Sequence, residues 1–579
     1  MKSFLKTLLA VILGIFVSFF LVLVILIVIL ASTEEKIVIE PNSILKLTLD
    51  KEIIERTDKN PFSNIDILGI YNTKQIGLKE LIENIKKAKY DDNIKGIYLE
   101  LSSIDGGITT IKEIRKSLID FKQSGKFLIA YGDYYSQGSY YLASVADSVF
   151  LNPEGSVELR GLNSQILFYK KVLEKIGIEA ELIRHGKYKS AAEPFVSDKM
   201  SLENKEQFAQ LLTSIWNDIV LDISASRKIN VNTLNKLADD LEAYNPKTCL
   251  KYRLIDSTIY KDQVNEILLS LSGTKQKEPK FVDLSKYEKV PITNQLKFSK
   301  NKIALIYAYG DVVLGSGDEG TVSSERISEA IRNARTDTSI KAIVLRVNSP
   351  GGSAIASEII WRELKLATKT KPVVASFGDY AASGGYYIAC AANKIVAEPT
   401  TITGSLGVFG LMLHGKELLN NKLGITTENI KTNRHSDFPS YTRPLDEAEK
   451  KFMQNEIDRI YNTFINHVAE GRKMKTDDVD KIAQGRVWSG IDAYNVKLVD
   501  TLGTISDAIS LAAQLANINN YRVVHLPKLE EPFEKILKEI GSTKIKINIP
   551  PYTDVYYYLE KISKFYDIQA RLPFEIKIY

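Results

Sequence analysis

A serine and a glycine turn carry the chemistry that this sequence suggests. Ser383 lies in GDYAASGGYY (378–387), after a strand-like apolar run and before a short stretch typical of a helix. Its hydroxyl would lie beside the free amide of Gly384 at the helix N-terminus, which can stabilise a developing negative charge. In the turn PGGS (350–353), two glycines let the backbone turn an amide toward a substrate carbonyl. Either motif alone is usually structural, but together they predict a nucleophile beside an oxyanion hole.

A serine nucleophile needs a base, and the common imidazole partner has no signature here. The chain has 5 histidines, but no GxSxG motif and no HExxH pair. A lysine can act as the base if burial lowers its pKa from about 10.4 toward 7 to 8, which costs roughly 4 kcal/mol of solvation. Lys189, in HGKYKSAAEPF (185–195), is flanked by small residues and fits this requirement best. Neither motif implies a metal or a cofactor.

The serine motif belongs to an internal repeat. Residues 94–153 align without a gap on residues 340–399 and share about 17 of 60 residues. The copies differ where the chemistry is expected, because Gln137 of the first copy stands opposite Ser383 of the second.

The lysine motif shows the opposite difference. GIEAELIRHGKYKS (177–190) aligns on GITTENIKTNRHS (424–436) with one inserted residue, which places Ser436 opposite Lys189. The first copy therefore has the lysine without the serine, and the second has the serine without the lysine. We expect the site to form where the two copies meet, and the ancestor to have been a homo-oligomer.

Strand and helix patterns alternate within each copy. In the second copy, residues 302–313, 341–349 and 371–377 are Val- and Ile-rich runs, and residues 324–335 have helical periodicity. Strands that alternate with helices indicate an α/β fold in which helices cover a parallel sheet.

Length and composition fit two globular domains. The net charge of +5 comes from 76 basic and 71 acidic residues, with no basic run carrying aromatics, so nucleic acid is not an expected partner. The two cysteines, Cys249 and Cys390, are best interpreted as apolar filler. The predicted division is a membrane anchor (1–36), a first repeat with the lysine (37–272), a polar linker (273–300), and a second repeat with the serine (301–579), with a basic aromatic tail from about 520.

The amino-terminal segment predicts a membrane anchor. From Leu8 to Ala31 the residues are apolar except for one glycine and one serine, and at about 1.5 Å per residue they could cross a hydrocarbon core of ~30 Å. A cleavable signal peptide is the alternative, but its apolar region spans only about 7 to 15 residues. Lys2 and Lys6 precede the span and two glutamates follow it, which predicts a cytoplasmic amino terminus and a body on the outer face.

Together these segments resemble the long, two-repeat form of the signal peptide peptidase A family, membrane-anchored Ser/Lys proteases with a crotonase-like, Clp-protease-like fold. The resemblance covers nearly the whole chain. Besides the anchor, it rests on YKSAAEPF (188–195), VLRVNSPGGS (344–353), GDYAASGGYYIA (378–389), TTITGSLGVFG (400–410) and GRVWSGIDAYNVKLVDTLG (485–503).

The resemblance implies both roles and a setting. The implied site consists of Ser383 as nucleophile, Lys189 as general base, the amides of Gly352 and Gly384 as oxyanion hole, and Ser405 as the hydroxyl that holds the lysine amine. The family degrades signal peptides left in the membrane after secretion. We therefore expect a single-pass protein of the bacterial inner membrane with its body on the extracytoplasmic face, no cofactor, and a homo-oligomer, a tetramer in the family.

Other functions stay open at this point. A crotonase-type acyl-CoA enzyme would use a similar oxyanion hole but needs neither Ser383 nor Lys189, and the anchor argues against it. A non-catalytic membrane scaffold would use the repeats for assembly alone. A related Ser/Lys protease with other membrane or misfolded substrates is a nearer alternative. Leu159 stands opposite Ser405 in the first copy, a further sign that the polar half-site is kept on one side.

Overall fold

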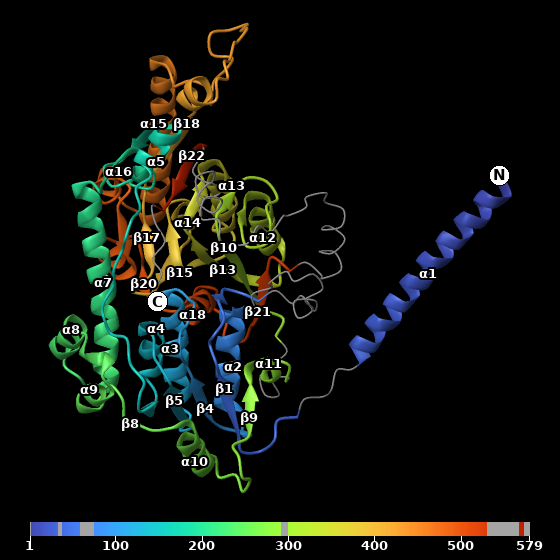
Figure 1. Ribbon diagram of the computed structural model, residues 1–579, viewed down its shortest axis with the longest axis vertical. Helices are drawn as coiled ribbons and strands as arrows, with labels where there is room; N and C mark the ends of the chain where they lie inside the picture. The colour runs from blue at the N-terminus through green and yellow to red at the C-terminus, as the bar shows by residue number, and fades with distance from the viewer. Residues whose placement is uncertain (1, 33–37, 58–74, 291–298, 530–566, 573–579) are drawn as a thin grey trace.

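The computed structural model describes residues 2–32, 38–57, 75–290, 299–529 and 567–572 (Figure 1). Within these residues the two repeats each contain a parallel sheet, and a third sheet takes strands from both.

The first repeat is built on a six-stranded parallel sheet with the order β8-β6-β5-β4-β1-β9. Its strands are β1 (Ser43–Leu47), β4 (Ile94–Glu100), β5 (Phe127–Gly132), β6 (Ser148–Leu151), β8 (Ser257–Thr258) and β9 (Phe281–Asp283). A small separate pair consists of β2 (Ile53–Ile54) and β3 (Ile76–Gly77). The central strands are almost wholly buried, as expected for a parallel sheet between helices.

The helices of this repeat differ widely in length. They are α2 (Leu78–Tyr90), α3 (Ile108–Lys122), α4 (Gln137–Ala143), α5 (Lys170–Ile176), α6 (Glu193–Val196), α7 (Leu202–Arg227), α8 (Val231–Asp239), α9 (Pro246–Lys251), α10 (Lys261–Ser272) and α11 (Leu284–Tyr287). Both β9 and α11 lie inside the stretch expected as a linker, 273–300. The ring of Tyr287 is fully buried, so this part of the stretch packs on the first repeat.

The second repeat has an eight-stranded sheet with the main order β19-β17-β15-β13-β10-β21, and β16 pairs with both β15 and β20. Its strands are β10 (Lys302–Tyr309), β13 (Ile340–Ser349), β15 (Val373–Ala382), β16 (Lys394–Ala397), β17 (Ile402–Gly404), β19 (Val487–Ser489), β20 (Thr501–Leu502) and β21 (Arg522–Leu526). Pairing is parallel except between β17 and β19. These bounds confirm the strands predicted at 341–349 and 371–377. The run predicted at 302–313 is divided, because β10 ends at Tyr309 and residues 312–313 form a separate strand in another sheet.

Among the described residues, the second repeat has fewer helices than the first. They are α12 (Ser324–Thr336), α13 (Ala354–Ala367), α14 (Gly384–Ala389), α15 (Glu447–Arg472), α16 (Thr476–Ile482), α17 (Gly490–Asn495) and α18 (Ile505–Leu515). The helix predicted at 324–335 is α12. The long helices α7 and α15 have 26 residues each and both end at a left-handed lysine, which agrees with the internal repeat.

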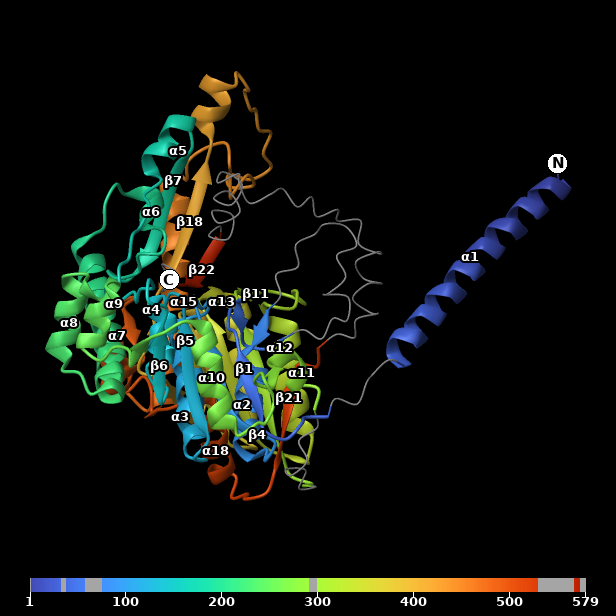
Figure 2. The ribbon, with the colours of Figure 1, turned by 60° about the horizontal axis from the view of Figure 1, so that its bottom comes forward.

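The third sheet, with the order β12-β11-β14-β22-β18-β7, joins the two repeats. Its strands are β7 (Glu179–His185), β11 (Val312–Val313), β12 (Val322–Ser323), β14 (Gly351–Ser353), β18 (Val408–His414) and β22 (Asp567–Arg571). Strand β7 of the first repeat pairs antiparallel with β18 of the second along its whole length, and Figure 2 shows the two side by side. The chain that follows β7 is therefore held against the second repeat.

Buried charges also connect the repeats. The guanidinium of Arg346, on β13, lies 3.0 Å from Glu55 and 2.8 Å from Glu113, both of the first repeat. All three side chains are almost completely buried. Because a buried charge is costly without its partner, this cluster fixes how the two repeats meet.

The amino-terminal segment forms α1 (Lys2–Ser32), which Figures 1 and 2 draw apart from both sheets. Within the described part of the chain, no helix meets the combined length and hydropathy that crossing a bilayer requires. The side chains of residues 22–32 lie outside that part.

Candidate active site

Ser383 occupies a strained elbow between β15 and α14. Its φ is 55° and its ψ is −115°, a region that non-glycine residues rarely adopt and that costs of order 1–3 kcal/mol. The backbone is held there by a hydrogen bond from the Ser383 amide to the Gly404 carbonyl, at 2.8 Å. The hydroxyl does not cap α14. A helix-capping role therefore does not explain this serine, and its side chain is free to face the lysine.

Lys189 reaches that hydroxyl from the first repeat. Its Nζ lies 2.7 Å from Oγ of Ser383, 3.0 Å from Oγ of Ser405 and 3.1 Å from the Ser405 carbonyl oxygen. The residue stands between β7 and α6, and the β7–β18 pairing carries it to the second repeat. The adjacent amide of Tyr188 donates to the carbonyl of Gln484, 2.9 Å away, which ties the same loop to the second repeat.

The environment of this amine favours its neutral form. Ser383, Lys189 and Ser405 are each 0% exposed. Burial lowers the pKa of Lys189 well below its usual value, because an ammonium ion loses its hydration there. A neutral amine can accept the proton of the serine hydroxyl, and the two oxygens of Ser405 orient it.

Two glycines that were not predicted from the sequence as site residues pack directly against the side chain of Lys189. A Cβ built on Gly485 would lie 2.6 Å from the Cβ of Lys189, and one on Gly407 would lie 3.1 Å from its Cδ. Gly485 also has a φ of 80°, which disfavours any side chain. Both glycines lie in quoted family segments, GRVWSG and TGSLG, so their position in those motifs was the available signal.

The predicted oxyanion-hole glycines are also close together. A Cβ built on Gly384 would lie 3.1 Å from the amide nitrogen of Gly352. Gly352 belongs to β14, next to the elbow, and its φ of 153° requires glycine. Two amides from different elements that lie this close together have the arrangement that an oxyanion hole requires.

The corresponding positions of the other half-site do not assemble. Gln137 is the first residue of α4, and its side-chain oxygen accepts from the amides of Arg160 and Gly161, each at 3.0 Å. Ser436, aligned with Lys189, is exposed and bonds only locally, to the carbonyl of Asn433. Within the described residues the serine and the lysine thus meet once, between the two repeats.

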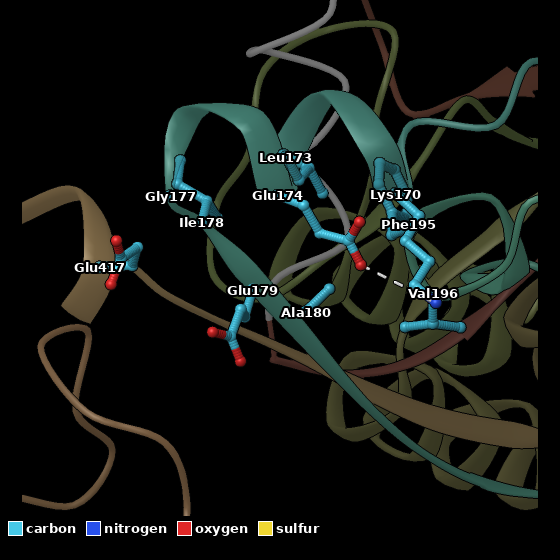
Figure 3. A pocket seen from close by; sticks show the side chains of 10 residues that line it. All are labelled: Lys170, Leu173, Glu174, Gly177, Ile178, Glu179, Ala180, Phe195, Val196 and Glu417. Carbon is cyan, nitrogen blue, oxygen red and sulfur yellow. Dashed lines mark ion pairs between the residues drawn. The ribbon is translucent and has the colours of Figure 1, made fainter. Parts of the chain in front are cut away.

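The cavity drawn in Figure 3 is separate from this arrangement. It has a volume of about 300 Å³ and is lined by α5, the start of β7, α6 and Glu417. None of the predicted site residues lines it, so we do not assign the chemistry to it.

Comparison with known proteins identifies the family. The chain matches the family model "Peptidase family S49" over residues 120–275 and 365–519, once in each repeat. It is 38% identical over 458 residues to Protease 4 of Salmonella typhi, and the aligned region covers 77% of this chain and 73% of that protein. The chain belongs to peptidase family S49. It is a serine peptidase in the two-repeat form, and its two α/β units with parallel sheets are the S49 repeats.

Further relatives of this S49 peptidase have similar names. The chloroplastic serine protease SPPA of Arabidopsis thaliana is 35% identical over 88% of this chain and 75% of its own. A putative signal peptide peptidase SppA of Enterococcus faecium is 34% identical over 36% of this chain and 63% of its own. Among solved structures, ClpP1 of Listeria monocytogenes matches 35% of this chain and 92% of its own at 17% identity and a TM-score of 0.23. A mutant of the 1510-N membrane-bound stomatin-specific protease matches 40% and 99% at 14% identity and a TM-score of 0.27.

Proposed function

We propose that this S49 peptidase is a membrane-anchored endopeptidase that cleaves signal peptides left in the membrane after secretion, with Ser383 as nucleophile and Lys189 as general base. The observation that carries the proposal is the 2.7 Å separation of Lys189 Nζ and Ser383 Oγ in a fully buried setting. A lysine kept neutral by burial needs no third, charged partner to be a base.

The proposed reaction has two steps. The neutral amine of Lys189 takes the proton of Ser383 as its oxygen attacks the peptide carbonyl, and the resulting oxyanion is bound by the amides of Gly352 and Gly384. The ammonium of Lys189 then gives the proton to the leaving amine. Water hydrolyses the acyl-enzyme by the same route in reverse, and Ser405 keeps the amine aligned throughout.

Labelling tests the nucleophile directly. A fluorophosphonate probe should label the wild-type protein, and Ser383→Ala should abolish the label. The Ser405→Ala variant should keep the serine but label more slowly, because the amine loses one of its two orienting atoms. An equal label in wild type and Ser383→Ala would remove the serine assignment.

The substrate class needs its own experiment. Detergent-solubilised protein is given a released signal peptide, a scrambled peptide of the same composition and an unfolded soluble protein. Preferred cleavage of the signal peptide supports the proposal. Faster cleavage of the unfolded protein would favour the alternative, a Ser/Lys protease that removes other membrane or misfolded substrates.

The membrane setting is part of the same proposal. The apolar run from Leu8 to Ala31 supports an anchor, and Lys2 and Lys6 before it support a body on the outer face of the bacterial cytoplasmic membrane. Protease added to spheroplasts should digest the body. Protection until the membrane is opened would reverse this orientation.

We also propose a homo-oligomer. The segment after β18 exposes several large apolar side chains, among them Leu423, Ile425 and Ile430. Replacing these three with serine should lower the mass measured by light scattering in detergent. An unchanged mass would remove this segment from the interface.

A further inference from the structure

A segment from the far end of the sequence lies in the candidate active site. Strand β22 (Asp567–Arg571) is inserted between β14 and β18 and runs antiparallel to both. On one side Gly352 stands opposite Ala570, and on the other Phe409 stands opposite Gln569. One wall, β14, carries the oxyanion-hole glycine, and the other, β18, carries the pairing that positions Lys189. Antiparallel addition of an extended strand is a common way for a protein to bind a peptide.

The backbone of this strand presents one carbonyl to the site. A Cβ built on Gly351 would lie 2.1 Å from the carbonyl oxygen of Ala570, and one on Gly384 would lie 3.0 Å from the same atom. The oxygen therefore lies beside Gly351 of the glycine turn and beside Gly384, which follows Ser383. One residue beyond the strand, the amide of Leu572 donates to the carbonyl of Pro350, 2.7 Å away. The carbonyl of Ala570 thus lies beside the glycines of the predicted oxyanion hole, where the carbonyl of a bound substrate would be expected.

The side chains of the segment are accommodated in the same way. Ala570 is 1% exposed and Leu572 is 2% exposed, and Leu572 packs into the core cluster of the first repeat. Arg571, between them, places its guanidinium 2.8 Å from the carboxylate of Asp311, beside β11. The space between β14 and β18 therefore holds a small residue, Ala570, and a cation, Arg571, directly after it.

We propose that residues 567–572 are an internal substrate-like strand that fills the peptide groove, held by the Arg571–Asp311 ion pair, and that a peptide substrate must displace it. This inference rests on the proposed function, because the strand blocks catalysis only if Ser383 and Lys189 perform it. The proposal gives residues 567–572, within the tail predicted from about residue 520, an autoinhibitory role.

The test weakens the strand without touching the catalytic residues. Arg571→Glu replaces an ion pair by two like charges, so the strand should leave the groove more often. With a short peptide substrate that is uncharged on both sides of the cleaved bond, kcat/KM should rise roughly three- to tenfold. The rate at which a fluorophosphonate labels Ser383 should rise by a similar factor. The matched control is Arg434→Glu. Arg434 lies outside residues 567–572, and its side chain is 77% exposed, so this variant should change neither rate.

A charge swap provides the specific readout. Adding Asp311→Arg to Arg571→Glu restores an attractive pair with its signs reversed, so both rates should return toward those of wild type. A defect in folding would not be repaired by this second change. Equal labelling rates in wild type, Arg571→Glu and the swap would overturn the proposal.

Addition of the segment in trans gives an independent measurement. A synthetic peptide DIQARL with blocked ends should slow the labelling of the Arg571→Glu protein, and a scrambled peptide should not. No difference between the peptides would contradict a groove that recognises this segment. Failure of the proposed function has a different signature, because then no variant would be labelled or would cleave a peptide.

Discussion

Gly485 leaves no space for a side chain against Lys189, since a Cβ at 485 would lie 2.6 Å from the Cβ of the lysine and 2.6 Å from its backbone nitrogen. The two residues come from different repeats. Contact at this range means that the position of the proposed catalytic amine depends on a residue that carries no functional group.

The variant Gly485→Ala should therefore displace the lysine and lower kcat far more than it affects substrate binding. We expect a loss of at least about tenfold, since a misplacement near 1 Å can cost roughly 100-fold. The matched control is Gly125→Ala, because Gly125 has a similar positive φ of 77° but no atom within 4 Å of its built Cβ. Both variants carry the same backbone strain, so equal activities would show that contact with Lys189 is irrelevant.

Removing either reacting group should abolish peptidase activity. Ser383→Ala and Lys189→Ala should each reduce kcat/KM to background, and the double variant should be no worse, because the two groups act as one unit. Lys187→Ala is the matched control, since Lys187 is an exposed lysine two residues away. If Lys189→Ala kept more than about a tenth of the turnover, a loss under roughly 1.4 kcal/mol, the base assignment would be wrong.

Nζ of Lys189 and Oγ of Ser383 meet within a single chain. When Ser383→Ala and Lys189→Ala proteins are assembled together, every site formed within a chain lacks one group, so activity should stay at background. Recovery of activity would mean that serine and lysine pair between chains. The measurement requires evidence of mixed assembly, which two affinity tags on the two variants supply.

The lowered pKa of Lys189 gives the rate a defined pH dependence. Only the neutral amine is a base, so kcat/KM should rise with pH through an apparent pKa well below the usual lysine value. A profile that is flat from pH 6 to 9, with the chemical step limiting, would contradict this.

The same pKa shift has a consequence for stability, with a definite sign. Between the lowered folded pKa and about 10.4, the unfolded chain binds a proton that the folded chain does not, so stability increases with pH across that window. Lys189→Met has no such proton. Its gain in free energy of unfolding over wild type should therefore be largest at low pH and should shrink as pH approaches 10, as denaturant titrations at several pH values would show.

The ion cluster between the repeats should contribute strongly to stability. Arg346→Ala leaves Glu55 and Glu113 buried without their cation, which should lower the free energy of unfolding by about 3–5 kcal/mol. Lys481→Ala removes an exposed, solvent-screened ion pair to Asp478 and should leave the free energy of unfolding close to that of wild type. Comparable losses in the two variants would mean that the cluster is not desolvated in solution.

Much of the site could be predicted because its chemistry depends on residue types at fixed spacings. Comparison of the two copies distinguishes Ser383 and Lys189 from the other serines and lysines of the chain, and the structure brings their side chains together. The packing of Gly485 on Lys189 was beyond reach, since a glycine's neighbours are set by tertiary contacts. Strand β22 could not be predicted either, because five residues with a mixed polar pattern show no strand period that distinguishes them from a loop. Polar composition likewise predicted a linker where β9 adds an edge strand.

The amide of Gln137 has a consequence for the history of this chain. Its oxygen accepts hydrogen bonds from the backbone amides of Arg160 and Gly161, and its nitrogen donates to the carbonyl of Gly161. Gly161 aligns with Gly407, which packs against Lys189 in the other half-site. At the position aligned with Ser383, the glutamine side chain is therefore held by three hydrogen bonds to the backbone. Gln137→Ser would remove these three hydrogen bonds, and the position aligned with Lys189 would still be Ser436. A second site would therefore need at least two coordinated substitutions, one that supplies the serine and one that supplies the lysine.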